Sequence, residues 1–123
     1  MIRGSPDLLG FTSVASQAGA GPLVAAARTT PHLLDAATQF GTIPDILNYW
    51  LTGELRAEYT SATTTQMIDA RRRTWAVDLL RELDLPVRLL PPIVEPGATI
   101  GLLKRSVCRA LADTPAVAPA CHD

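Results

Sequence analysis

The sequence is poor in aromatic residues, in cysteine and in excess charge, and each shortage excludes a class of function. Only 5% of the 123 residues are aromatic, and the formal net charge is -1. Binding to a nucleic-acid backbone or to anionic lipid needs clustered positive charge, so neither partner is predicted. Two cysteines, Cys108 and Cys121, are too few for a disulfide framework. We therefore expect reduced thiols and a cytoplasmic protein.

Long apolar runs are missing as well. No run approaches the roughly 20 residues that cross a bilayer. The N-terminus lacks the cationic stretch and apolar core of a signal peptide. Hydrophobic residues nevertheless make up 47% of the chain, which provides a core for at most one small domain.

Several segments combine helix end signals with apolar residues at i, i+4 and i+7. Residues 23–28 suit one or two helical turns. Residues 30–41 and 42–53 each begin with a threonine and an early proline and end at a glycine. Thr74 is expected to cap a helix over residues 75–83. Leucines in residues 103–111 predict one more helix, which would carry Cys108. The residues expected to face inward are Leu33, Ala37, Phe40, Ile46, Leu47, Trp50, Leu51, Trp75, Leu79, Leu80, Leu83, Leu103, Val107, Ala110 and Leu111.

The predicted strands are few and short. They fall at residues 66–69, 99–102 and 116–120, and the last is expected to be buried and to carry Cys121, His122 and Asp123 at its C-terminal end. In open α/β sheets ligands bind at that end of a strand. Four prolines make residues 83–97 an extended connector. Such strands do not form a closed sheet alone, so we expect part of a larger α/β domain.

Polar residues in the middle of the chain have both structural and functional interpretations. Asp45 and Glu58 suggest an acid/base pair, but the first turn of a helix and a polar linker explain them better. Residues 54–65 are expected to form a tight turn or a short irregular helix, because hydroxyl side chains bond nearby backbone. Tyr59 and this threonine cluster are interpreted as a packed turn or as the lining of a sugar pocket. The two tryptophans are expected in the core rather than as sugar-stacking platforms.

Other motifs carry weaker signals. Cys121 and His122 suggest a metal site or a thiol nucleophile, but no pair of ligands has zinc-site spacing and no third orienting group is in view. Residues 71–73, three arginines, predict a solvated turn rather than a nucleic-acid patch. The Gly-Ala-Gly at residues 19–21 lacks the preceding strand that a phosphate loop requires.

Five segments carry a family resemblance. They are IPDILNYWLTGE at residues 43–54, EYTSATTTQMID at 58–69, Trp75 ahead of a leucine helix, LPVRLLPPIVEPG at 85–97 with a glycine at Gly101, and VAPACHD at 117–123. Together they resemble the N-terminal domain of the FGGY carbohydrate kinases, most of all the rhamnulokinase branch. The resemblance covers residues 31–123, and residues 1–30 match it poorly.

The resemblance implies a fold and an activity. The family has two RNase H-like domains of the actin-like ATPase type, with sugar bound mainly to the first and ATP to the second. It implies that Asp123 is the catalytic base and that His122 contacts the sugar. The expected reaction transfers the ATP γ-phosphate to a ketose hydroxyl, with L-rhamnulose as the expected ketose and Mg²⁺ offsetting phosphate charge.

The departures from the family predict a truncated piece of a kinase. The family's first phosphate loop and its adenosine-binding domain have no counterpart among these 123 residues. We therefore expect a gene fragment, a remnant or a partial gene model that is inactive in isolation. The alternative is a non-catalytic, small helical interaction module, which would have a self-contained core. Orphaned strands and exposed apolar faces would favour the kinase piece.

Overall fold

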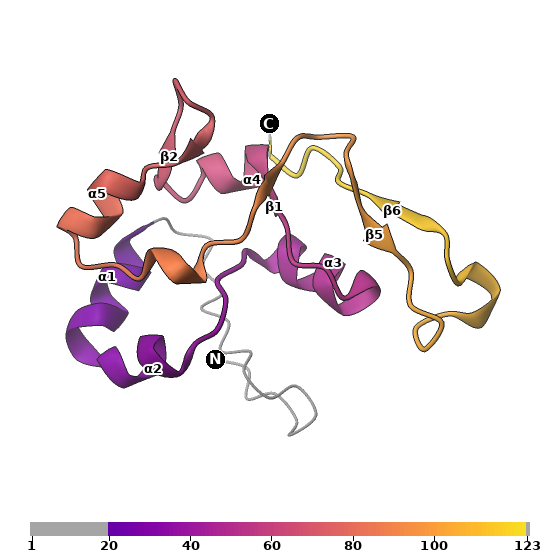
Figure 1. Cartoon of the computed structure of the whole chain (residues 1–123), viewed down its shortest axis with the longest axis horizontal. Helices are drawn as coiled ribbons and strands as arrows, with labels where there is room; N and C mark the ends of the chain where they lie inside the picture. Colours follow the sequence, from indigo (N-terminus) through magenta and orange to yellow (C-terminus); the bar gives the residue numbers. More distant parts are fainter. Residues whose placement is uncertain (1–19, 123) are drawn as a thin grey trace.

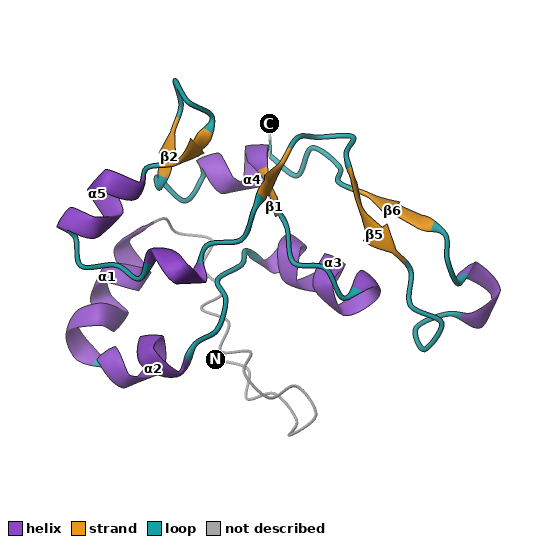
Figure 2. Cartoon of the chain, in the orientation of Figure 1, coloured by secondary structure: helices purple, strands orange, loops and turns teal. Residues whose placement is uncertain are grey.

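A computed structural model describes residues 20–122, and Figure 1 shows their path. Short helices and short strands are joined by loops that occupy much of the length of the chain (Figure 2). The elements in chain order are α1 (Ala20–Thr29), α2 (Pro31–Ala36), α3 (Ile43–Thr52), β1 (Ala57–Glu58), α4 (Tyr59–Thr63), β2 (Ile68–Asp69), β3 (Thr74–Trp75), α5 (Val77–Glu82), the 3₁₀ helix η2 (Val87–Leu89), β4 (Ile93–Val94), β5 (Thr99–Leu102), the 3₁₀ helix η3 (Arg109–Leu111) and β6 (Pro115–Val117).

The described strands form three two-stranded sheets. β1 pairs with β4 in parallel, β2 with β3 in antiparallel, and β5 with β6 in antiparallel with an irregularity between Thr99 and Gly101. The β5–β6 hairpin lies at the right of Figure 1, beside α3, and the Lys104 N–H donates to the Leu51 carbonyl oxygen at the end of that helix at 2.9 Å. A mostly helical chain with a few short strands is what the sequence predicted, and the strands expected at residues 66–69 and 99–102 are confirmed as β2 and β5.

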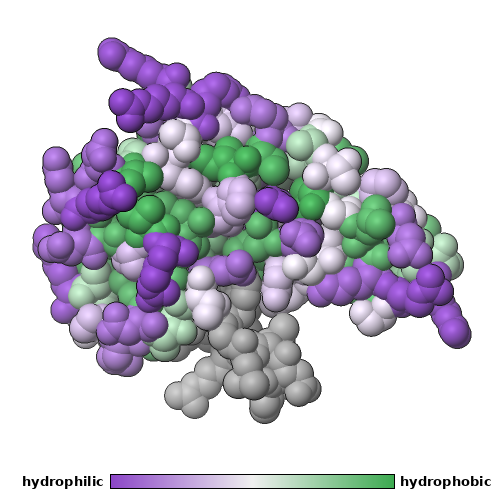
Figure 3. Space-filling view, viewed as in Figure 1, coloured by the Kyte–Doolittle hydropathy of each residue, from purple (hydrophilic) through white to green (hydrophobic). Residues whose placement is uncertain are grey.

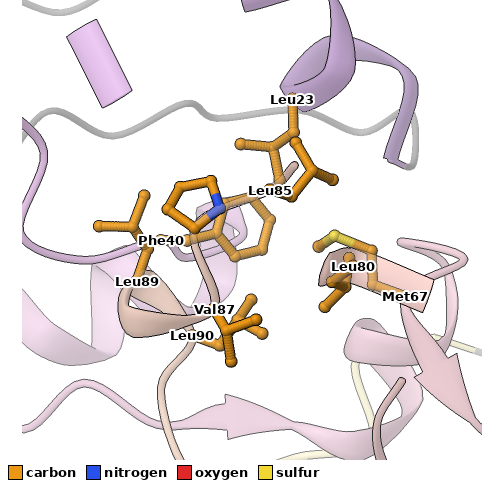
Figure 4. A pocket seen from close by; sticks show the side chains of 9 residues that line it. Leu23, Phe40, Met67, Leu80, Leu85, Val87, Leu89 and Leu90 are labelled. Carbon is orange, nitrogen blue, oxygen red and sulfur yellow. The ribbon is translucent and has the colours of Figure 1, made fainter. Parts of the chain in front are cut away.

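The core lies between α1, α2, α5 and η2. Phe40 meets Trp75 edge to face, with ring centroids 6.5 Å apart, and the Trp75 indole N–H donates to the carbonyl oxygen of Pro91 at 2.8 Å. Figure 4 shows the leucines, Phe40 and Met67 converging on a gap of only about 10 Å³. A gap of that size holds one water molecule at most, so this region is a packed core and not a ligand site.

The helix predicted over residues 30–41 is shorter than expected. α2 ends at Ala36 because Ala37 turns to extended backbone, with φ -71° and ψ 139°. The Phe40 N–H then donates to the Leu89 carbonyl oxygen at 2.7 Å instead of to its own helix. Phe40 is buried as predicted, but tertiary contact with η2 overrides the helical periodicity.

The helix predicted over residues 75–83 begins later. Thr74 and Trp75 pair with β2 as strand β3, so Thr74 is not a helix cap and α5 starts at Val77. Leu80 is 1% exposed, whereas Leu79 and Leu83 face solvent at 45% and 37%. The inward prediction is therefore correct for Leu80 and wrong for its two neighbours.

Residues 103–111 do not form the predicted helix. Leu103 donates its N–H to the Thr114 carbonyl oxygen, and Asp113 returns a bond to Leu103, so the segment is an excursion of the β5–β6 hairpin. Val107 and Leu111 are 47% and 53% exposed rather than inward. Cys108 precedes η3, a single 3₁₀ turn, instead of lying on an apolar helix. Pairing with β6 outweighs the helical spacing here.

The strand predicted at residues 116–120 is displaced and only partly buried. β6 covers Pro115–Val117, and Ala118 is the buried residue beside it. Within residues 20–122 there is no helix long and apolar enough to span a membrane.

Candidate functional site

Three segments distant in sequence enclose a pocket of about 330 Å³. The start of α3, the helix α4 and residues 121–122 meet there. Hydroxyls, a proline ring, a thiol and an imidazole share the lining, which is formed by Thr42, Ile43, Pro44, Ser61, Thr64, Cys121 and His122.

The start of α3 is fixed by a capping box. Asp45 Oδ2 accepts from the Thr42 backbone N–H at 3.0 Å and from the Thr42 hydroxyl at 2.7 Å. Thr42 Oγ1 lies 3.1 Å from Ser61 Oγ, which ties α3 to α4. Gly53 ends the helix in the left-handed region, at φ 87°, as the sequence predicted. The entry of the chain into the pocket is therefore rigidly defined.

The sequence suggested that Glu58 lies in a polar linker. In the structure Glu58 is instead buried and is hydrogen-bonded to several segments. It is 1% exposed at the end of β1, and its N–H donates to Asp45 Oδ1 at 3.2 Å. Its carboxylate accepts from the backbone N–H groups of Thr60 at 2.7 Å, Ser61 at 3.0 Å and Cys121 at 3.3 Å. These bonds begin α4, the short irregular helix expected within residues 54–65, and also hold residue 121.

The two buried carboxyls respond differently to this environment. Burial raises the pKa of Asp45 above its ordinary value, and hydrogen bonds from Thr42 offset only part of that effect. Burial also opposes the charge on Glu58, but hydrogen bonds from Thr60, Ser61 and Cys121 outweigh it and lower the pKa of Glu58. The hydrogen bonds around Glu58 therefore favour its ionised form, whereas burial of Asp45 opposes its charge.

The residues after β6 reach the pocket. Cys121 and His122 line it, and the His122 backbone N–H donates to Thr60 Oγ1 at 3.2 Å. Burial, followed by the charges of Glu58 and Asp45, raises the pKa of the Cys121 thiol. A thiol that holds its proton is a poor nucleophile, which argues against the Cys–His nucleophile interpretation. Asp123, the predicted base, lies outside the described residues.

The remaining predicted residues divide between core and surface. Trp75 is in the core as expected, but Trp50 is 39% exposed and not a core residue. The Tyr59 ring is covered by the Arg73 guanidinium at 3.7 Å, and Tyr59 is not among the pocket's lining residues. Ser61 and Thr64 from the same cluster do line it. The arginines at residues 71–73 are exposed in a turn, as predicted.

Sequence reasoning named Glu58 beside Asp45 but missed its burial and its contact with Cys121, because the contacts are long-range. Glu58 meets Asp45 across 13 residues and Cys121 across 63. No spacing rule detects such pairs. The only local signal is a carboxylate two and three residues ahead of Thr60 and Ser61, which is typical of side-chain capping of a helix start.

The described residues do not fit a metal ion. Within residues 20–122, no group of three or more histidine, cysteine or acidic side chains is arranged to hold one. All four carboxylate oxygens of Asp45 and Glu58 accept hydrogen bonds from the chain itself. Both cysteines are free thiols.

Most of the chain matches a known protein family. Residues 26–123 match the model described as "FGGY family of carbohydrate kinases, N-terminal domain". Among curated proteins, the rhamnulokinase of Oceanobacillus iheyensis is 38% identical over 102 residues, which cover 82% of this chain and 22% of that protein. The rhamnulokinase of Pectobacterium atrosepticum is 42% identical over 71 residues, covering 58% and 14%. The chain thus spans about a fifth of the length of such relatives.

Solved structures agree on the fold. Gluconate kinase from Lactobacillus acidophilus superposes with a TM-score of 0.76 at 24% identity, over 84% of this chain and 22% of that one. Ligand-bound xylulose kinase from the same species gives a TM-score of 0.72 at 23% identity, over 83% and 22%. The described segment therefore has the fold of part of a sugar-kinase domain of the actin-like ATPase type, as predicted.

Proposed function

The chain belongs to the FGGY family of carbohydrate kinases, and from that premise we propose that it forms part of the sugar-binding side of an ATP-dependent kinase. The observation that carries the proposal is the pocket between α3, α4 and residues 121–122, inside the segment that matches the family. Its hydroxyl groups suit a polyhydroxylated ligand, because each donates and accepts hydrogen bonds. A cytoplasmic location goes with this proposal.

Asp123 is the proposed catalytic base, as the family resemblance implies. Its carboxylate accepts the proton of the sugar hydroxyl as that oxygen attacks the γ-phosphorus. His122 is the proposed sugar contact, and it borders the pocket next to Ser61 and Thr64. ATP and Mg²⁺ are proposed for the whole kinase. The described residues do not fit the metal, so no step is assigned to it here.

L-rhamnulose is the proposed sugar. The curated relatives that match at 38% and 42% identity carry the name rhamnulokinase. The structures named xylulose and gluconate kinase are less similar in sequence, at 23% and 24% identity. Xylulose and gluconate are therefore the substrates to compare with L-rhamnulose.

A chimeric kinase with a replaced segment, the exchange enzyme, tests this function. In it, residues 31–123 replace the matching segment of the Oceanobacillus iheyensis rhamnulokinase, and ADP formation is measured with L-rhamnulose, D-xylulose and gluconate. We expect sugar-dependent turnover that is fastest with L-rhamnulose. A folded exchange enzyme without turnover would contradict the kinase function, and a preference for either other sugar would contradict the substrate.

The isolated 123-residue chain is expected to be inactive. It matches the N-terminal domain of the family, whereas the resemblance assigns ATP mainly to the second domain. Incubation with L-rhamnulose, ATP and Mg²⁺ should release no ADP above background. Turnover at ordinary kinase rates, about 1–100 s⁻¹, would refute this expectation.

The alternative, a non-catalytic helical interaction module, has less support. It requires apolar faces that are covered within the chain. On α3, however, Ile43, Leu47, Trp50 and Leu51 are 37–49% exposed. Figure 3 likewise shows apolar side chains gathered across the middle of one face. Exposure of this kind favours part of a larger domain.

A further inference from the structure

Two consecutive backbone amides next to Asp123 are held by side chains from a distant segment. The Cys121 N–H donates to Glu58 Oε2 at 3.3 Å, and the His122 N–H donates to Thr60 Oγ1 at 3.2 Å. Residues 58–60 precede these amides by more than 60 positions. The two bonds therefore fix where the end of the β6 segment lies relative to α4.

Glu58 orients the Thr60 hydroxyl, which accepts the hydrogen bond from the His122 N–H. The Thr60 hydroxyl donates its single proton to Glu58 Oε2. A hydroxyl that has donated its proton presents only lone pairs to other partners. It is thereby set to accept from His122. Replacing the Glu58 carboxylate would therefore disturb both amides, whereas removing the Thr60 hydroxyl would disturb chiefly the second.

Glu58 itself is rigidly held. Its N–H is bound by Asp45, which in turn is bound by Thr42 at the start of α3. Neither carboxylate forms an ion pair within the described part of the chain. A buried carboxylate without a cation is costly unless its oxygens are fully hydrogen-bonded. Amide donors from two segments meet that need here.

Capping of α4 does not account for the whole arrangement. The N–H groups of Thr60 and Ser61 are the capping donors at the start of this five-residue helix. The bonds from Cys121 and His122 come from outside α4 and contribute nothing to its capping. Their distinctive effect is to place the backbone that leads directly into the proposed base.

We propose that Glu58 and Thr60 are positioning residues, which hold the Cys121–His122 backbone, the stretch that directly precedes the proposed base, against α4. This inference rests on the proposed function for the role of Asp123. The hydrogen-bonded anchor is independent of it. Neither residue is given contact with substrate, so their influence on the reaction is through residues 121–123.

The anchor is tested by amide hydrogen exchange on the 123-residue chain, followed residue by residue by NMR. Loss of the hydrogen bond that an amide donates should speed its exchange by up to about tenfold. We expect this at Cys121 and His122 in Glu58→Gln, and at His122 in Thr60→Val. Thr60→Ser keeps the hydroxyl and should restore slow exchange.

Two references separate local from global effects. Glu54→Gln makes the same chemical change at an exposed site and should leave both amides unchanged. The Gly53 N–H, bound to the Tyr49 carbonyl oxygen at 2.7 Å, reports on the rest of the fold. If Glu58→Gln unfolds the chain, Thr60→Val decides. Unchanged exchange at His122 in Thr60→Val would overturn the proposal.

The catalytic consequence is tested in the exchange enzyme. Thr60→Val should lower kcat by about tenfold, because a displaced base loses part of its contribution. KM for the sugar should change little, and Thr60→Ser should recover the rate. Faster amide hydrogen exchange at His122 in Thr60→Val, together with an unchanged kcat, would overturn the positioning role. If the exchange enzyme shows no turnover at all, the proposed function is refuted. The amide hydrogen-exchange measurement on the 123-residue chain still tests the anchor.

Discussion

At the scale of single residues, the charge on Glu58 is the feature with the clearest physical consequence. Its pKa lies below the ordinary 4.5 even though burial opposes ionisation, because donors from Thr60, Ser61 and Cys121 favour the charged form. A carboxyl with a lowered native pKa stabilises the fold above its unfolded pKa. That contribution is lost as the pH falls through the native value. Asp45, with a raised pKa, has the opposite sign.

Glu58→Gln should therefore destabilise the chain more at neutral than at acidic pH. We expect a loss of about 1.5–3 kcal/mol at pH 7, the usual range for hydrogen bonds to a charged group. The difference from the wild-type chain should be smaller at pH 3, because this contribution begins to be lost once the pH falls below the ordinary glutamate pKa of 4.5. Urea unfolding at both pH values measures it, with Glu54→Gln as an exposed control. An equal difference at both pH values would be inconsistent with this account.

The Cys121 thiol offers a second test at this scale. Its pKa is raised by burial and by the charges of Glu58 and Asp45, so its thiolate should form only at high pH. In a Cys108→Ser background, the pH midpoint of alkylation by iodoacetamide should lie above the ordinary value of about 8.5. Glu58→Gln should lower that midpoint, and Glu54→Gln should not. If Glu58→Gln left the midpoint of alkylation unchanged, the Cys121 thiol and the Glu58 carboxylate would not interact.

At the scale of elements, α3 separates what sequence predicts from what it does not. Its start at Thr42 and its end at Gly53 were predicted, because caps and left-handed glycines are local signals. Its buried face was not. Ile46 is 5% exposed, as expected, but Leu47 is 49% exposed. Periodicity identifies an apolar stripe, whereas burial depends on which neighbours the chain supplies.

Neighbouring residues of α3 provide a direct test of its orientation. Ile46→Ala should cost about 2–5 kcal/mol, because it leaves a cavity in a packed site. Leu47→Ala should stay within about 0.5 kcal/mol, as for other exposed substitutions. Both changes leave alanine, so helix propensity is matched closely. Urea unfolding of the two variants measures the free energy of unfolding that each loses. Equal losses would mean that α3 is oriented differently.

The same distinction explains the other errors at this scale. Residues 103–111 have helical spacing, but Leu103 is bonded to Thr114 across the hairpin. Thr74 has the chemistry of a cap, yet it pairs with β2. In each case hydrogen bonding across a turn or hairpin overrides a local helical preference. Neither partner could be identified from spacing alone.

At the scale of the whole molecule, the pocket is assembled from segments that lie far apart in the chain. His122 was assigned a sugar contact from the family resemblance, and it borders the pocket, although its role stays a prediction. The burial of Glu58 and its bond to residue 121 could not be predicted, since its partners lie 13 and 63 residues away. The division at residue 30 also stays a prediction. Family membership was the part of the account that sequence motifs identified correctly.

The most direct test of the central claim, that this chain supplies the catalytic base of a sugar kinase, is kcat of the exchange enzyme with Asp123→Asn. The matched control is Asp113→Asn, since Asp113 is an exposed surface residue whose left-handed backbone, at φ 66°, suits asparagine. We predict that Asp123→Asn lowers kcat by about 10²–10⁴ while Asp113→Asn leaves it unchanged. Full activity in Asp123→Asn would contradict the account.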